Sequence, residues 1–154
     1  MLVDFDDLRL LISQWQTREE APHLAASVGF AMTRVHLESG LDVVVSQFSV
    51  RSSFLNAIDA IVGDTSARLV EVTLTAEPEC VAGRFRKRRE ERTAAGAADV
   101  GGDIPTGDVD EVVRWADEEL RRLVAARPDA IAVDATDDVE STLSRVLEVL
   151  GVAG

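Results

Sequence analysis

Cysteine, histidine and long apolar runs are scarce or absent in this sequence, and each absence excludes a class of protein. The single cysteine, Cys80, excludes a disulfide within the chain. The two histidines, His23 and His36, have no partners at the spacing of a zinc site. No apolar run reaches the roughly 18 residues that cross a membrane. We therefore expect no disulfide, no metal site and no membrane as partner, with the cytoplasm as the compartment.

Basic residues are also few. The 16 Lys and Arg against 28 Asp and Glu give a net charge of -12 and a pI of about 4.5. A surface this acidic repels nucleic acid and anionic membranes, so we expect neither as a partner. Asp4, Asp6 and Asp7 stand where a secretory signal peptide would be basic, so we expect no signal peptide. A phosphate ligand would need a local cluster of basic side chains.

The chain does contain an alternation of short apolar runs and helical patterns. The apolar runs predict strands at residues 2–5, 42–46, 69–74 and 130–133. Helical periodicity predicts helices at about 6–15, 20–39, 51–62, 77–92, 109–126 and 139–150. This alternation is typical of an α/β fold, with a parallel sheet and helices on both of its faces. The length fits a single domain, residues 1–154.

Capping and turn residues mark the ends of the predicted helices. Asp6 or Asp7 can cap the first helix, and Asp108 with Glu111 resembles a capping box for the fifth. Residues 93–107 are rich in Ala and Gly without periodicity, so they predict a mobile loop and, with the residues before it, a lid over about 84–108. The glycines that we expect to end helices are Gly40, Gly63 and Gly151.

The first candidate site is the segment Asp4-Phe5-Asp6-Asp7-Leu8-Arg9, where the first predicted strand passes into a helix. Open parallel sheets bind ligands at the carboxyl ends of their strands. A carboxylate there can accept a proton from a hydroxyl nucleophile or hold the water shell of Mg2+. The same pattern also fits a strand end followed by a helix N-cap, because Asp is a preferred cap. Spacing alone leaves both interpretations open.

The second candidate is a basic cluster at 84–92, which holds six of the 16 basic residues. Arg84, Arg88 and Arg92 are four residues apart, so they form one stripe on a helix. Arginine suits phosphate because its planar fork donates two parallel hydrogen bonds. In a chain this acidic we favour an anion site. The alternative is a solvated face with the ion pairs Arg86–Glu90 and Lys87–Glu91, an order that pairs weakly on a helix.

The third candidate lies just beyond the second predicted strand. Ser46 and Gln47 leave the strand there, and Arg51 follows shortly after. Polar groups at the end of a buried parallel strand are well placed to meet a ligand. A loop start followed by a surface arginine explains the same pattern equally well.

In order and spacing these features resemble the P-loop kinase-like proteins called AAA family ATPases, which are similar to zeta toxins, gluconate kinases and chloramphenicol phosphotransferases. The likeness covers nearly the whole chain from Leu2 onward. It rests on Asp6-Asp7-Leu8-Arg9, HLESGLDVVVSQ at 36–47, Arg84-Phe85 through Arg88, and Arg127-Pro128 before the last strand. The resemblance implies a P-loop NTPase fold of the nucleotide-kinase type. It also implies ATP and Mg2+ as cofactors, with a small molecule of unknown identity as the phosphoryl acceptor.

The resemblance further implies roles for individual residues. Asp6 would be the base for the acceptor hydroxyl, and Arg84 and Arg88 would contact the phosphates of ATP. Relatives often carry an Asp at the end of the third strand to support Mg2+, but Ser46 occupies that position here. The side chains that would contact the acceptor are Arg9, Gln47 and Arg51.

One part of the family's pattern does not occur in these residues. Such domains carry a first, central strand followed by G-x-x-x-x-G-K-[ST], whose amides and lysine hold the phosphates. The sole lysine, Lys87, follows Arg86 within a helical pattern, so the sequence holds no such loop. We therefore expect a fold that lacks its first strand, weak or no ATP binding, and no phosphotransfer. We also expect the reading frame to extend upstream through a strand and Gly-Lys-Ser or Gly-Lys-Thr.

The alternative function is a non-catalytic domain derived from such a kinase. It would bind a partner, or a second copy of itself, through exposed strand edges. The DNA directly upstream discriminates the two, because a P-loop in an open frame favours the kinase and a stop codon favours the binding domain.

Overall fold

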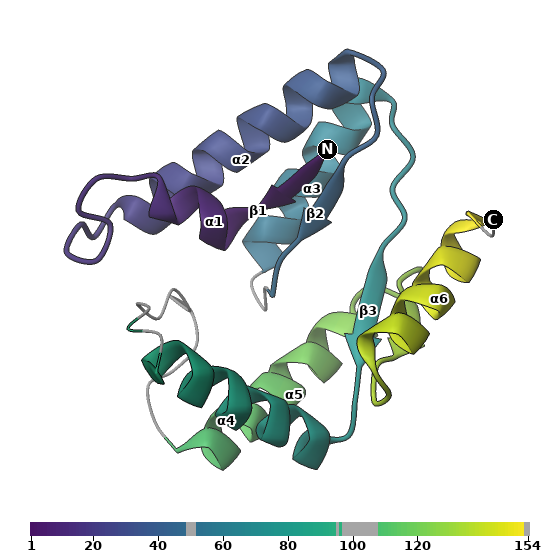
Figure 1. Cartoon of the computed structure of the whole chain (residues 1–154). Coiled ribbons are helices and arrows are strands. Elements are labelled where there is room, and N and C mark those ends of the chain that lie inside the picture. Colours follow the sequence, from purple (N-terminus) through teal and green to yellow (C-terminus); the bar gives the residue numbers. More distant parts are fainter. Residues whose placement is uncertain (49–51, 95, 97–107, 153–154) are drawn as a thin grey trace. The chain divides into compact units, whose positions relative to one another are not determined.

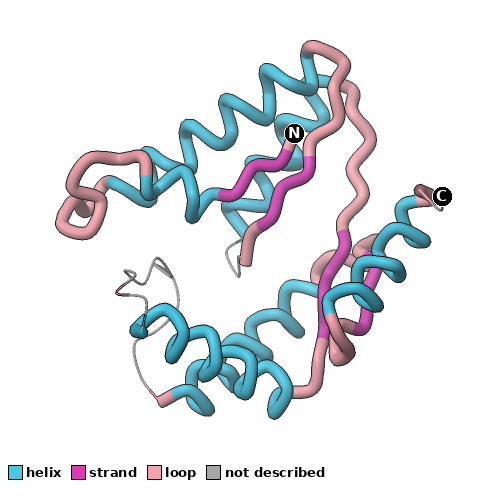
Figure 2. The backbone as a smooth tube through the Cα atoms, in the orientation of Figure 1, coloured by secondary structure: helices cyan, strands magenta, loops and turns pink. Residues whose placement is uncertain are grey.

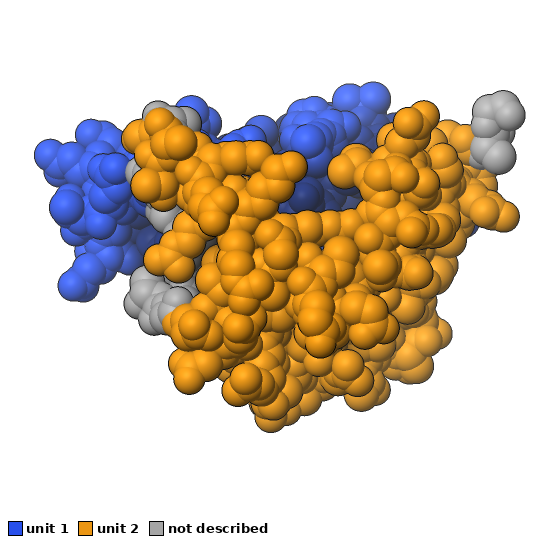
Figure 3. All heavy atoms as spheres, turned by 60° about the horizontal axis from the view of Figure 1, so that its bottom comes forward, with its two compact units in different colours: residues 1–69, 99–104 blue, residues 70–98, 105–154 orange. Residues whose placement is uncertain are grey.

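The expected alternation of strands and helices is present in a computed structural model, which describes residues 1–48, 52–94, 96 and 108–152 (Figure 1, Figure 2). The described residues fall into two compact units, one of Met1–Leu69 and one that begins at Val70 (Figure 3). Each unit contains one pair of parallel strands. The chain is therefore a mixed α/β protein with parallel strand pairing.

The first unit is built on β1 (Leu2–Asp4) and β2 (Val44–Ser46), which pair in parallel (Figure 1). The prediction that runs 2–5 and 42–46 lie beside each other is confirmed. Val3 is only 1% exposed, whereas Leu2 and Val44, which lie opposite each other, are 65% and 61% exposed. Side chains alternate between the two faces of a strand, so one face of this pair is covered and the other carries exposed apolar side chains.

Three helices belong to the first unit: α1 (Phe5–Leu10), α2 (Ala21–Glu38) and α3 (Ser52–Thr65). The long helix α2 contacts β1 and also packs against α1 and α3, so it connects all parts of this unit. Gly40 follows α2 with a φ of 73°, which confirms the glycine expected at that helix end.

Three phenylalanines form the centre of this unit. The ring centroid of Phe5 lies 5.3 Å from that of Phe30 and 4.9 Å from that of Phe54, in tilted and edge-on geometries. Gly29 makes this cluster possible, because a Cβ at that position would lie 2.4 Å from Cε1 of Phe5. The sequence thus brings the Phe5 ring against the backbone of α2 by omitting one side chain.

The second unit contains β3 (Val72–Thr75), β4 (Ile131–Asp134), α4 (Pro78–Ala94), α5 (Val109–Ala125) and α6 (Val139–Leu150). The strands β3 and β4 pair in parallel, which confirms the prediction for runs 69–74 and 130–133. The helices α4 and α5 pack against each other, and α6 packs on β4.

The core of the second unit is small and mostly aliphatic. Ala82 on α4, Val112 and Val113 on α5, and Val133 on β4 are all buried. An ion pair between Arg127 and Glu71 joins the residues just before β4 and β3, with Nε of the arginine 2.6 Å from the carboxylate. Both side chains are about one-fifth exposed, at 21% and 19%.

Two predicted helix ends in the second unit are confirmed. Asp108 is the N-cap of α5, and its carboxylate accepts hydrogen bonds from the backbone N–H groups of Asp110 and Glu111. Gly151 follows α6 in the left-handed region, with a φ of 70°. In both cases the residue type at the end decides the geometry, as the physics of capping predicts.

Two other predicted ends are wrong. Asp4, not Asp6 or Asp7, caps α1. That helix was expected to continue to about residue 15 but ends at Leu10, and a series of turns follows it. The helix α3 continues through Gly63 to Thr65, and the left-handed residue that follows it is Ser66, with a φ of 56°. None of the described helices combines the length and hydrophobicity that a membrane span requires.

Candidate functional site

The carboxyl ends of β1 and β2 bring two polar residues together in the first unit. Asp4 and Ser46 are opposite each other in the strand register, and each is the last residue of its strand. The carboxylate of Asp4 accepts hydrogen bonds from the backbone N–H groups of Asp6, at 2.9 Å, and Asp7, at 3.3 Å. Asp4 therefore acts as a helix cap, as one of the two interpretations of this segment required.

Asp6 and Arg9 lie on the short helix that Asp4 starts. Strand β1 ends two residues before Asp6, so Asp6 belongs to the first turn of α1 and not to the strand end. Its side chain is half-buried. The guanidinium of Arg9, one turn further along α1, lies 5.9 Å from the ring centroid of Trp15. This cation–π contact holds Arg9 against the turns that follow α1.

Gln47 follows β2 directly, at the same edge of the sheet as Ser46. Its side-chain nitrogen donates a hydrogen bond to the backbone oxygen of Phe48 at 3.1 Å, and Gln47 itself is half-buried. The third member of this predicted group, Arg51, lies outside the described residues.

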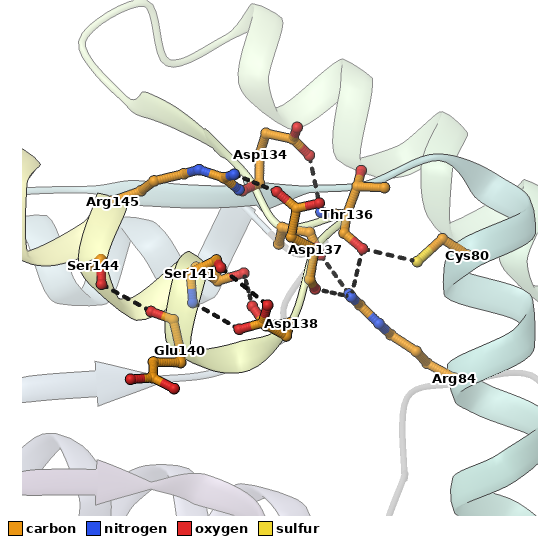
Figure 4. Close-up of polar contacts among 12 residues, drawn as sticks. Cys80, Arg84, Asp134, Thr136, Asp137, Asp138, Glu140, Ser141, Ser144 and Arg145 are labelled. Carbon is orange, nitrogen blue, oxygen red and sulfur yellow. Dashed lines mark hydrogen bonds and ion pairs between the residues drawn. The ribbon is translucent and has the colours of Figure 1, made fainter.

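Arg84 occupies an unexpected position in the second unit. From α4 its guanidinium donates to the backbone oxygens of Ala135, at 2.5 Å, and Thr136, at 2.8 Å, and also to that of Asp137 (Figure 4). The guanidinium to which the resemblance assigns ATP phosphates thus bonds three consecutive carbonyl groups in the loop after β4.

Three other basic side chains of α4 also have partners within the protein. The guanidinium of Arg88 lies 5.7 Å from the ring centroid of Phe85. Arg86 forms an ion pair with Asp110 near the start of α5, not with Glu90 as the sequence suggested. Nζ of Lys87 lies 3.9 Å from the carboxylate of Glu91, so one of the two pairs expected for a solvated helix face is present.

A second arginine holds the loop after β4 from the opposite side. Arg145 on α6 donates to the backbone oxygen of Asp134 at 2.8 Å and pairs with the carboxylate of Asp137 (Figure 4). Its hydrogen bond to Asp137 raises the pKa of Arg145. The loop of residues 135–138 is therefore bonded to α4 by one guanidinium and to α6 by another.

The carboxylates of Asp134 and Asp138, at the two ends of this loop, accept hydrogen bonds from residues close by in the sequence. Asp134 accepts a hydrogen bond from the backbone N–H of Thr136 at 2.9 Å, and hydrogen bonds from Thr136 lower the pKa of Asp134. Asp138 is the N-cap of α6, and hydrogen bonds from Ser141 lower the pKa of Asp138. Both groups are ionised at neutral pH, where they stabilise the bend that leads from β4 into α6.

The predicted site residues divide between the two units. Asp6, Arg9 and Gln47 belong to the first unit, while Arg84 and Arg88 belong to the second. Sequence reasoning missed Asp4 as the residue that ends β1, and it missed Arg145 altogether. The contacts of Arg145 are with Asp134 and Asp137, which precede α6, so helical periodicity does not predict them.

Within the described ranges, no group of three or more His, Cys, Asp or Glu residues has the arrangement of a metal site. Comparison with models of known protein families gives no match for this sequence, and no curated protein matches it either.

Proposed function

We propose that this chain is an ATP-binding, P-loop kinase-like protein of the phosphotransferase or ATPase type, with a nucleotide-kinase fold that lacks its first strand. We also propose that its 154 residues are inactive by themselves, because the sequence contains no Walker A loop. The resemblance carries the kinase assignment, and the geometry of the strands supports it.

The observation that supports the proposal best is the pattern of strand pairing. In the family that the sequence resembles, the first strand lies at the centre of the sheet, between the strands that correspond to β2 and β3. The remaining strands then form two separate parallel pairs, and β1–β2 and β3–β4 are such pairs. Exposed apolar side chains on Leu2 and Val44 fit this proposal, because parallel strands are normally covered on both faces.

Without a Walker A loop, the other side chains proposed to contact ATP would bind it weakly. In a P-loop protein most contacts to the triphosphate come from loop amides, a helix N-terminus and the loop lysine. Here Arg84 is bonded to three carbonyl groups, which leaves Arg88 as the main candidate for a phosphate contact. One charge-assisted hydrogen bond contributes about 1.5–3 kcal/mol, less than the roughly 4.1 kcal/mol that millimolar binding requires. We therefore assign no catalytic step to this chain.

Isothermal titration calorimetry with ATP and Mg2+ tests the proposal. We expect dissociation constants of about 1 mM or weaker for the 154-residue chain. A chain that also carries residues encoded before Met1 should bind ATP far more tightly if those residues include the Walker A loop. In that chain Arg88→Ala should impair turnover, and Asp6→Asn should abolish it with little loss of ATP affinity. Micromolar ATP binding by the 154-residue chain would contradict the argument.

A non-catalytic binding domain is the second candidate function. The notion of association through exposed strand edges gains support from the exposed pair Leu2 and Val44, because an uncovered apolar surface marks a site for association with another chain. Sedimentation velocity over a range of concentrations tests self-association. Val44→Lys should abolish any dimer, while Val35→Lys on the exposed surface of α2 serves as the control.

A further inference from the structure

Arg84 directs its hydrogen bonds at one short segment, the loop after β4. Three consecutive backbone oxygens, from Ala135 to Asp137, accept hydrogen bonds from its guanidinium. One turn earlier on α4, the thiol of Cys80 lies 3.5 Å from the backbone oxygen of Thr136. Residues four apart share a helix face, so a single face of α4 is directed at this loop (Figure 4).

The loop that Arg84 contacts has a defined shape on its other sides as well. The backbone N–H of Ala135 donates to the oxygen of Thr75, the last residue of β3, at 2.7 Å. Arg145 holds the loop from α6 through the backbone oxygen of Asp134. The loop therefore stands at the carboxyl ends of β3 and β4, the edge at which open parallel sheets bind ligands.

We infer that Arg84 is a positioning residue that fastens α4 to the β4–α6 loop and does not grip phosphate. A planar guanidinium with five N–H donors can bond three carbonyl groups at once, whereas the single ammonium of a lysine cannot reproduce that geometry. The first turns of α4 then form a fixed base, while most of the loop that the sequence predicts at residues 93–107 lies outside the described residues. This inference concerns the apo chain and stands whether or not the chain binds ATP.

The sole cysteine of the sequence supplies a chemical reporter for this contact. Cys80 is half-buried beside the loop, so detachment of the loop exposes its thiol. Because Arg84→Lys keeps the positive charge, faster labelling in both Arg84→Ala and Arg84→Lys reports exposure of the thiol and not the change in charge.

The experiment measures two rates in the full chain: labelling of Cys80 by a disulfide reagent, and hydrogen exchange of the amides at 135–138. We expect Arg84→Ala to raise both rates about tenfold, and Arg84→Lys to behave similarly because it keeps the charge but loses the fork. The matched control Arg88→Ala, with the same charge change one turn away on α4, should leave both rates unchanged. Millimolar tripolyphosphate should not accelerate labelling of the unsubstituted chain.

Results that differ from these expectations overturn the inference. Unchanged labelling and exchange in Arg84→Ala would show that the carbonyl contacts do not hold the loop. Acceleration by tripolyphosphate in the unsubstituted chain would show that an anion draws Arg84 away, which is the phosphate role. The calorimetric titration with ATP tests the proposed function alone, because neither rate depends on a nucleotide.

Discussion

The strands β1 and β4 end in an acidic residue, but the chain leaves them in different ways. After β1 it enters α1 at once, and Asp4 caps that helix through hydrogen bonds to residues two and three positions later. After β4 it runs through residues 135–138 before α6, and arginines about 50 residues earlier and 10 residues later hold that loop. The first junction is encoded locally, whereas the second depends on long-range contacts.

This difference indicates how substitutions should act in the two units. A local junction fails when its own cap or its close packing is removed. A junction held by distant side chains fails when either partner is lost. The following experiments are arranged from the largest expected effect to the smallest.

Gly29→Ala should have the largest effect, because the new Cβ would lie 2.4 Å from the Phe5 ring in the centre of the first unit. Overpacking of this kind costs about 1–3 kcal/mol, so the free energy of unfolding should fall by that amount. The control Gly63→Ala lies on α3, where a Cβ meets nothing within 4 Å, and should leave stability equal or higher. Urea denaturation followed by circular dichroism measures both, and equal effects would disprove the close approach.

The Arg127–Glu71 ion pair should contribute an effect of similar size, in the second unit. A double-mutant cycle with Arg127→Ala and Glu71→Ala should give a coupling of about 1.5–3 kcal/mol, because both side chains are mostly buried. The exposed pair Arg121–Asp117 on α5 is the comparison, and its coupling should be much smaller. Similar couplings for the two pairs would mean that burial does not set their strength.

Removal of a helix cap should have a moderate effect. Asp4→Ala should lower the free energy of unfolding by about 1 kcal/mol, because the first N–H groups of α1 lose their acceptor. Asp6→Ala should cost less, since Asp6 is inside the helix and not its cap. If Asp6→Ala proved the more damaging in thermal unfolding, the assignment of the cap to Asp4 would be wrong.

Acid should weaken the junction after β4, with the smallest effect of the four. The pKa values of Asp134 and Asp138 are lowered in the folded protein, so their stabilisation is complete above the usual aspartate pKa near 4. It is lost as the pH falls further, through the lowered pKa values. The urea midpoint should therefore decline below about pH 4, and the decline should be shallower in Asp134→Asn and Asp138→Asn. An unchanged decline would assign it to other carboxylates.

The sequence was sufficient to predict those parts of the fold that depend on neighbouring residues. The alternation of strands and helices, both parallel pairs, the Asp108 cap and the glycine after α6 were all predicted correctly. The end of α3 was not, because Gly63 tolerates a helix and the left-handed residue is Ser66. A glycine in the sequence shows where a helix can end, but it does not show that the helix ends there.

The candidate site was harder to predict for the same reason. A stripe of arginines indicates a basic helix face, but it does not show which partners lie beyond that face. The bonds from Arg84 to residues about 50 positions later depend on how α4 lies against β4, and no pattern along the sequence gives that orientation.

The division of the described residues into two compact units has a practical consequence. The chain has no tyrosine and two tryptophans, Trp15 in the first unit and Trp115 in the second. Each unit therefore carries one intrinsic fluorophore, and Trp15→Phe or Trp115→Phe leaves emission from a single unit. Unfolding curves from the two variants show directly whether the units melt in one transition or in two.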